Sequence, residues 1–332
     1  GVLRLEEVVR THGLRKILRY SRLIQDYTER ILRDTLRSVP DGTYGFSDFL
    51  DDDGFDTSSI RIGVEITIQG DEAVVDFRSS DPQTRGGVNA NSAVTLSAVL
   101  YVFRCLVEED IPFNTGLIRP IRLLLSDRSV VNAAFPAPTA AGNVETSQRL
   151  VDVLLGALAQ AVPDLIPAAS SGTMNNVTFG GQDPVLNTGF AYYETIGGGM
   201  GAGSGCDGLD GVHTHMTNSL NTPLEALENT LPLRIRRYGF RRSSGGRGKF
   251  DGGNGIVREF EFSFPTQVSI MSERLRHAPY GLQGGQDGKR GRNILISHGT
   301  KKILRSKVNM EAAPGDVLRI ETPGGGGHGR KN

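Results

Sequence analysis

Two histidines stand two positions apart in the stretch GVHTHMTNSLNTPLE, residues 211–225. His213 and His215 follow a glycine-rich run, GGGMGAGSGCDGLDG, at residues 197–211. In an extended chain, side chains two positions apart point to the same side, so both imidazoles are expected to face one pocket. There they could transfer protons or donate hydrogen bonds to a substrate.

Histidines at this spacing could also bind a metal ion, which requires at least a third ligand. Asp207 and Asp210 are the neighbouring carboxylates, but no HExxH-like spacing supports a metal site. We therefore favour the interpretation in which the histidines bond to substrate or to nearby loops without a metal.

The glycine-rich run contains a match to GxGxxG at residues 203–208, but no apolar helix follows it, as a dinucleotide site requires. Gly248-Lys249 is followed by Phe250 and is not a Walker A loop. The sequence thus predicts no nucleotide site in this chain. The glycines are expected to form a tightly turned wall whose backbone amides could meet an anion.

Two further polar segments could contribute to a site. GNVETSQ at residues 142–148 precedes an apolar run, and Asn143 is placed to cap a helix over about 144–161. Glu145 in the same segment could instead face a substrate or partner. Arg274, in SERLRHAPYG at 272–281, could clamp a carboxylate, although from chemistry alone a solvated charged loop is the better explanation. No Ser-His-Asp arrangement is recognisable.

The elements that must position these residues alternate in type along the chain. The first forty residues have helical spacing and end at Pro40-Asp41-Gly42, and residues 60–68 alternate as a half-buried strand that turns at Gly70-Asp71 into a second strand. Helices are expected over 92–109 and 144–161, and a capping box at 222–225 predicts a short helix. From residue 255 onward the pattern is rich in strands.

These patterns predict an α+β fold of mixed helices and antiparallel sheets, with a strand-rich C-terminal third. The nearest indication of a sub-boundary falls at about residues 165–172. The 332 residues have a formal net charge of zero, which argues against nucleic acid as a partner, and no apolar stretch suits a membrane span. Two cysteines without CxxC spacing fit a reducing, cytoplasmic compartment.

Six segments, in order along the chain, resemble the hydantoinase B/5-oxoprolinase family. They are DPQTRGGVNA (81–90), GNVETSQRLVD (142–152), DGVHTHMTNSLNTPLEALE (210–228), SSGGRGKFDGGNGIVREFEF (243–262), SERLRHAPYGLQGG (272–285) and PGDVLRIETPGGGGHG (314–329).

This resemblance implies a B-type subunit of an ATP-dependent enzyme that hydrolyses cyclic amides such as hydantoins and 5-oxoproline. ATP with Mg²⁺ would bind a separate hydantoinase A-like subunit in a hetero-oligomer, where it would activate the amide oxygen by phosphorylation. The B-type subunits of this family are longer, so residues 1–332 are expected to be a C-terminal portion. The likely metal ligands of the family belong to an upstream NDPY-type region that this chain lacks.

Within this chain, motif position and chemistry together nominate six residues. His213 and His215 are expected to act as acid, base or hydrogen-bond donors. Asn143, Glu145 and Asn218 are expected to position the substrate, and Arg274 to hold an anionic group. Two alternatives remain open: a subunit of an ATP-dependent ketone carboxylase of the same family, and a non-catalytic scaffold that completes an assembly.

Overall fold

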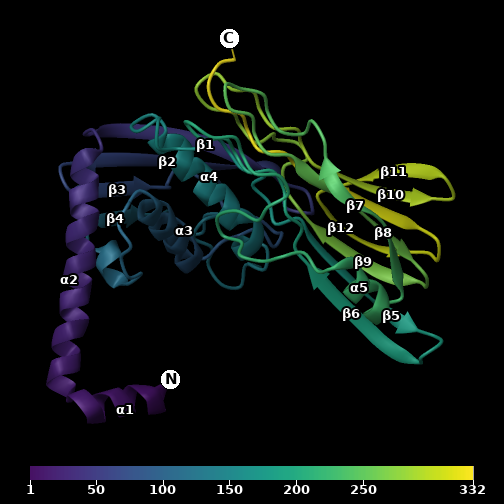
Figure 1. Ribbon diagram of the computed structural model, residues 1–332, viewed down its shortest axis with the longest axis horizontal. Coiled ribbons are helices and arrows are strands. Elements are labelled where there is room, and N and C mark those ends of the chain that lie inside the picture. Colours follow the sequence, from purple (N-terminus) through teal and green to yellow (C-terminus); the bar gives the residue numbers. More distant parts are fainter. Residues whose placement is uncertain (332) are drawn as a thin grey trace.

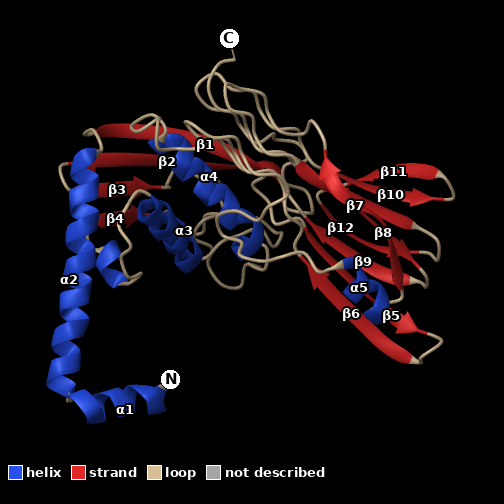
Figure 2. Cartoon of the chain, in the orientation of Figure 1, coloured by secondary structure: helices blue, strands red, loops and turns tan. Residues whose placement is uncertain are grey.

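The computed structural model describes residues 1–331. It contains a helical arm at the N-terminus, a first half in which helices pack on a sheet, and a second half of two facing sheets (Figure 1). Helices and strands are both well represented, and nearly all strand pairs are antiparallel, so the α+β prediction is confirmed (Figure 2).

The arm consists of α1 (Val2–His12) and α2 (Leu14–Ser38), which meet at an angle (Figure 1). Gly13 separates them with a φ of 81°, a conformation that favours glycine. Only the last part of α2 is anchored, through the buried side chains of Thr28, Leu32 and Leu36. The predicted helical N-terminus is therefore confirmed, with a break inside it and an end just before Pro40.

The first half is built on a four-stranded sheet in the order β1-β2-β3-β4. Its outward-inward alternation is clearest in β2, where Ile60, Ile62 and Ile66 are completely buried. α3 and α4 pack against one another, and α4 also contacts β1 and β2 (Figure 2). The elements are β1 (Gly42–Asp52), β2 (Ser58–Gln69), β3 (Glu72–Asp76), β4 (Ile121–Leu124), α3 (Ser92–Cys105), α4 (Ser147–Leu158) and a 3-10 turn (Thr115–Ile118).

The entry to α4 differs from the prediction. A π-helical turn, Gly142–Thr146, precedes the helix, and the amide of Thr146 donates to the carbonyl of Ala141 across the wider turn. No side chain caps α4, so the prediction that Asn143 is its N-cap is wrong. All of α4 is buried, including its charged residues Arg149 and Asp152.

The second half is a sandwich of a five-stranded sheet, β11-β10-β13-β8-β7, and a four-stranded sheet, β12-β9-β5-β6. Phe179 from one sheet stacks edge-on against Phe260 and Phe262 from the other. The elements are β5 (Asn176–Asp183), β6 (Thr188–Glu194), α5 (Leu224–Thr230), β7 (Leu233–Arg241), β8 (Gly255–Phe262), β9 (Thr266–Met271), β10 (Arg292–Ser297), β11 (Thr300–Leu304), β12 (Lys307–Ala312) and β13 (Val317–Glu321).

The buried apolar residues form two clusters. The first extends along the chain to Ile166 and the second begins at Val177. Buried polar contacts join the halves; for example, the amide of Asp51 in β1 donates to Glu273 after β9 at 2.6 Å. Whether residues 165–172 separate two domains stays a prediction.

Glycine-rich segments fill the region where the long loops gather, next to the C-terminus (Figure 1). They pack backbone against backbone: a Cβ on Gly325 would lie 1.9 Å from the carbonyl oxygen of Met200, and one on Gly199 would lie 2.0 Å from that of Gly253. Hydrogen bonds such as Gly325 N–H to Gly253 O, 2.9 Å, hold the segments together. The glycine run before His213 is thus one layer of a packed bundle.

Within residues 1–331, no helix combines the length and the apolar character needed to cross a lipid bilayer.

Candidate functional site

His213 and His215 lie in the loop between β6 and α5, beside the packed glycine-rich segments that contain Gly199, Gly253 and Gly325, which we call the glycine bundle. Val212 forms a two-way backbone bridge with Gly198, at 2.8 and 3.0 Å, which fixes the start of the segment. The chain then turns, and His215 adopts a φ of 57°, so the segment is not the extended strand expected. Both imidazoles nevertheless line the same cavity.

This cavity, which we call the histidine pocket, has a volume of about 570 Å³. That is within the range of pockets that enclose small organic ligands. Its walls are largely apolar and come from α3, α4 and the glycine-rich segment. Its lining residues are Tyr101, Cys105, Leu106, Glu108, Leu155, Leu165, Ile166, Pro167, Ser170, Met200, Leu209, Val212, His213, Thr214 and His215.

Each imidazole has a buried Nε2 that meets no hydrogen-bonding partner among residues 1–331. The other nitrogen of His215, Nδ1, lies 3.3 Å from the hydroxyl of Tyr101 on α3. Burial raises the pKa of Tyr101, so its phenol keeps the proton and can donate it to Nδ1. With the phenol as donor, the ring hydrogen of His215 lies on Nε2, which is then a hydrogen-bond donor; with the phenol as acceptor, Nε2 is an acceptor.

Burial lowers the pKa of both histidines, because an apolar surrounding disfavours the charged imidazolium. For His215 the pKa falls to about 4, so this ring is neutral at neutral pH. Burial also raises the pKa of the Cys105 thiol, which keeps it protonated and a poor nucleophile. The pocket therefore presents two neutral imidazoles, and within residues 1–331 Glu108 is the one acidic residue in its lining.

α4 holds the histidine loop from one side. The side-chain amide of Gln148 donates to the carbonyl of Thr214 at 3.0 Å and to the hydroxyl of Thr217 at 2.9 Å. Gln148 is buried in the first turn of α4. Gln148, the last residue of the polar GNVETSQ motif, therefore supports the loop that leads from the histidines to α5.

The sandwich holds the other end of the loop. Glu194, at the end of β6, accepts hydrogen bonds from the amide of Thr222 at 2.9 Å and from Asn221 at 3.2 Å. Arg258 of β8 donates to the carbonyl of Thr222 and lies 3.3 Å from Glu194. The predicted capping box is wrong: α5 begins after Pro223 without a side-chain cap, because Thr222 is engaged by Glu194 and Tyr192.

The other four nominated residues do not line the histidine pocket. Asn143 and Asn218 have exposed side chains, in the π-helical turn and in the loop before α5. Glu145 is completely buried and accepts a hydrogen bond from Asn176 at 2.7 Å. The structure thus unites the two histidines and leaves Asn143, Glu145, Asn218 and Arg274 around, but outside, their cavity; their roles as substrate contacts stay predictions.

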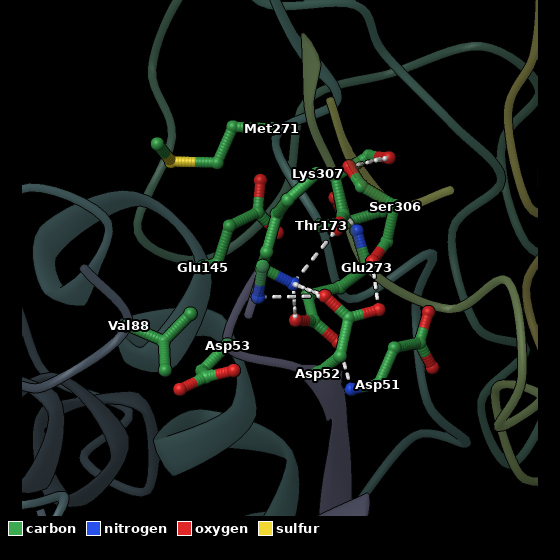
Figure 3. Close-up of polar contacts among 12 residues, drawn as sticks. Asp51, Asp52, Asp53, Val88, Glu145, Thr173, Met271, Glu273, Ser306 and Lys307 are labelled. Atoms are coloured by element: carbon green, nitrogen blue, oxygen red, sulfur yellow. Dashed lines mark hydrogen bonds and ion pairs between the residues drawn. The ribbon is translucent and has the colours of Figure 1, made fainter. Parts of the chain in front are cut away.

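Glu145 belongs to a second group of buried charges, drawn in Figure 3. Lys307 forms an ion pair with Glu273 and lies 3.9 Å from Asp52, and Ser306 donates to Asp52 at 2.6 Å. Burial raises the pKa of Glu273 to about 7, against the opposing effect of Lys307. It also raises the pKa of Glu145 well above its ordinary value, with Glu273 adding to the effect. Burial among these groups therefore disfavours the charged carboxylate of Glu145.

Arg274 is buried in an ion-pair network between the halves. Its guanidinium contacts Asp48 of β1 at 2.8 Å and Asp152 of α4, and Arg149 contacts the same two carboxylates at 2.9 and 3.1 Å. A further hydrogen bond joins Arg274 to the carbonyl of Ala278 at 3.0 Å. These contacts give Arg274 a structural task independent of any substrate.

The side chains of residues 1–331 do not form a ligand set for a metal ion. Within residues 1–331, no three His, Cys, Asp or Glu side chains converge as a metal centre would need. The two carboxylates near the histidines have other tasks: Asp207 accepts from the amide of Asp251 at 2.7 Å, and Asp210 from that of Asn254 at 2.6 Å. Both tie the glycine-rich segment to the neighbouring loop.

Sequence reasoning missed several residues that shape the site. Tyr101 lies in an apolar helix and carries no motif, so only the fold reveals that it meets His215. Glu194 and Arg258 occupy strands and appear in sequence as ordinary alternating charges. Their complete or near-complete burial, which sequence alone does not give, marks them as loop anchors.

The family model described as Hydantoinase B/oxoprolinase matches residues 1–331. Among curated relatives, 5-oxoprolinase 1 of Arabidopsis thaliana is 40% identical over 340 residues, which cover 99% of this chain and 26% of that protein. The putative B-type subunit of a D-/L-hydantoinase from Pseudomonas sp. (strain NS671) is 32% identical, with 99% and 57% covered. The chain thus spans between a quarter and somewhat over half of the length of these relatives.

Solved structures share the fold. The ATP-dependent caprolactamase from Pseudomonas jessenii superposes with a TM-score of 0.86 and 27% identity, covering 98% of this chain and 58% of that one. A nucleotide-free acetone carboxylase structure also has a TM-score of 0.86, over 98% of this chain and 51% of the other. At 18% identity, the second match shows a common fold alone.

Proposed function

Because this chain belongs to the hydantoinase B/oxoprolinase family, we propose that it is part of an ATP-dependent enzyme that hydrolyses the C–N bond of a small cyclic amide. Relatives named as a 5-oxoprolinase and as the B-type part of a hydantoinase, and the structural likeness to an ATP-dependent caprolactamase, support this choice of chemistry. We place ATP and its Mg²⁺ on a hydantoinase A-like partner or domain, and residues 1–332 in the C-terminal portion of the B-type part.

The observation that carries the proposal is the pair of buried, unpartnered Nε2 atoms in the histidine pocket. A buried polar atom without a partner costs roughly 1–3 kcal/mol, a cost that a bound ligand would remove. A small cyclic amide has a carbonyl acceptor and a ring N–H donor on an otherwise apolar frame. Such a molecule matches an apolar cavity of about 570 Å³ with two polar positions.

The two rings take different parts in this proposal. The phosphoryl group that ATP supplies stays on the amide oxygen, so negative charge develops on the ring nitrogen as water attacks the carbon. His215, neutral and held by Tyr101, donates its Nε2–H as a hydrogen bond to that nitrogen. His213 accepts a proton from the attacking water and returns it to the ring nitrogen as the C–N bond breaks, and a second water then releases phosphate from the acyl phosphate that remains. The apolar wall excludes bulk water and strengthens both interactions.

The remaining nominated residues act from outside the pocket. Glu145 lies in the turn that leads into α4, and Gln148 at the start of that helix bonds to the histidine loop. Arg274 fixes α4 through Asp152. We propose that Glu145 and Arg274 position α4, and that the exposed Asn143 and Asn218 contact substrate or partner where the rest of the assembly covers them.

The test is a substrate panel with the full-length protein and its ATP-binding partner. ATP consumption and ring opening are measured with 5-oxoproline, hydantoin and caprolactam, and with acetone plus bicarbonate. Equal amounts of ADP and ring-opened product from a cyclic amide would support the proposal. ADP formed only with the ketone and bicarbonate would establish the carboxylase alternative. Activity that is lost without this chain but persists when His213 and His215 are both replaced would support the scaffold alternative.

A further inference from the structure

A second cavity, which we call the basic pocket, borders the buried charges of Figure 3, because Asp51, Asp52 and Ser306 are among its lining residues. Its volume is about 610 Å³, and it shares no lining residue with the histidine pocket. Asp52 and Ser306 reach it from the buried cluster. Six cationic side chains line it: Arg241, Arg276, Lys289, Arg290, Arg292 and Arg305.

Few negative charges offset the positive charge of these six side chains. Within residues 1–331, only Arg241 among them forms an ion pair, with Glu321 at 3.3 Å. The lining contains two carboxylates, and both accept hydrogen bonds from other groups of the protein. Asp51 accepts from the amides of Leu275 at 2.6 Å and Arg276 at 3.1 Å.

Asp52 accepts from Ser306 at 2.6 Å and from the amide of Gly54 at 2.9 Å. Like charges gathered in a cavity repel one another, and the effect is visible at Arg241. Burial lowers the pKa of this residue; Glu321 opposes the effect, and the neighbouring Arg292 adds to it. A multiply charged anion would relieve the repulsion.

The backbone that presents the cations is firmly held. Lys289 donates its amide to Ser244 at 2.7 Å and accepts from Gly324 at 3.1 Å, and the amide of Gly291 donates to Arg274 at 2.9 Å. Arg292 begins β10, and Arg305 directly follows β11. The positions are therefore organised before any ligand binds, which lowers the entropic cost of binding.

We propose that the basic pocket binds a small molecule that carries two or more phosphate groups, such as inorganic pyrophosphate or the diphosphate of a nucleotide. Guanidinium groups match phosphate oxygens in pairs, and several of them in one cavity suit several adjacent phosphates. The charge is concentrated in a concavity and the chain as a whole is neutral, which favours a small ligand over nucleic acid. This inference does not rest on the proposed amide chemistry.

Calorimetric titration of the full-length protein at about 50 mM salt tests it, because low salt limits screening. The probes are pyrophosphate, ADP, inorganic phosphate, citrate and an oligo-glutamate peptide. The variant Arg292→Gln/Arg305→Gln removes two cations whose guanidinium groups make no hydrogen bond within residues 1–331. The control, Arg234→Gln/Arg237→Gln, removes two exposed cations of β7 that lie outside the basic pocket.

We expect one equivalent of pyrophosphate or ADP to bind with at least tenfold higher affinity than citrate. The pocket variant should weaken that equivalent at least tenfold, and the control should alter it less than twofold. A nucleotide site elsewhere in the protein would still bind its ligand in the pocket variant. The decisive result is therefore that the variant binds one equivalent of ligand fewer than the wild type.

The proposal is overturned if neither pyrophosphate nor ADP saturates, if the control weakens binding as much as the pocket variant, or if citrate binds as tightly. It is also overturned if only the acidic peptide binds, since the surface would then be a protein-docking site. Should the first variant unfold, Arg276→Gln/Lys289→Gln provides the same test with two other cations of the pocket.

Discussion

Arg274 in the second half of the chain and Asp152 on α4 of the first half form an ion pair in which both side chains are completely buried. Asp48 and Arg149 complete the network, so two guanidinium groups face two carboxyl groups where the two halves meet. Burial raises the pKa of Asp152 to about 8, against the opposing effect of Arg149. Removing one member of a buried network leaves the others without compensation, which is costly.

We therefore predict that Arg274→Met destabilises the protein by about 3–5 kcal/mol. Urea unfolding monitored by circular dichroism measures the change. Arg236→Met, which removes an exposed ion pair with Glu261, should cost less than about 1 kcal/mol. Wild-type stability of the Arg274 variant, combined with a raised KM, would instead establish Arg274 as a substrate contact.

The glycine bundle predicts a large effect from a single methyl group. In Gly325→Ala the new Cβ would overlap the carbonyl oxygen of Met200 at 1.9 Å, so one backbone must move. We expect a loss of about 3 kcal/mol or more in the free energy of unfolding. Gly239→Ala on β7 meets no atom within 4 Å and should be neutral or stabilise by roughly 0.5 kcal/mol. Equal effects of the two variants would refute the close packing.

The lowered pKa of His215 makes stability depend on pH in a defined direction. Above about pH 6.5, the ordinary histidine value, the ring is neutral in both the folded and the unfolded chain. As the pH falls from 6.5 toward about 4, the unfolded chain binds a proton that the folded chain excludes, so stability decreases. The slope from this group is at most about 1.4 kcal/mol per pH unit.

His215→Gln should abolish that contribution, so the variant gains stability relative to the wild type between pH 6.5 and 4.5. Glu273 has the opposite effect on stability over the same pH range: its pKa is raised to about 7 in the folded chain, so protonation of this group favours folding as the pH falls. Both proteins contain Glu273, so its effect cancels when the stability of the variant is compared with that of the wild type. Chemical unfolding at pH 7.0, 6.0 and 5.0 measures the difference. If the difference in the free energy of unfolding between variant and wild type did not change with pH, His215 would bind its proton as readily in the folded chain as in the unfolded chain.

Gln148 holds the loop that contains His213 and His215, so its removal should affect catalysis. Gln148→Ala removes the two hydrogen bonds to Thr214 and Thr217, and so loosens the histidine loop without touching the imidazoles. We expect kcat/KM to fall by roughly tenfold to a hundredfold, since small misplacements of catalytic groups are costly. Gln160→Ala, at the end of the same helical segment, loses one surface hydrogen bond to Gly45 and is the control. Unchanged kinetics in both variants would remove Gln148 from the account.

The regular elements were largely accessible from the sequence. The alternating isoleucines of β2, the helical spacing of α2 and the strands after residue 255 all follow simple periodicity. β1 escaped prediction because its alternation of Tyr44, Phe46 and Leu50 is interrupted by Asp48, whose carboxylate the fold buries in an ion pair.

The site was only partly accessible. The histidine pair was found by its spacing, yet the rings share a cavity through a turn at His215 instead of through strand geometry. Arg274 and Glu145 carried the same polar signal as the histidines, but that signal arises equally from buried networks between distant segments. Tyr101 and Gln148 meet the histidine loop only in three dimensions, over separations of 114 and 66 residues.

Whether the amide reacts in the histidine pocket is tested by ATP-coupled hydrolysis of 5-oxoproline by the complete assembly with His213→Asn and His215→Gln, singly and together. We predict that each single variant lowers kcat/KM at least a hundredfold, that the double variant loses little more, and that thermal stability at pH 7.5 changes little. Turnover by the double variant within threefold of the wild type would contradict the account, because the histidine pocket would then not be where the amide reacts.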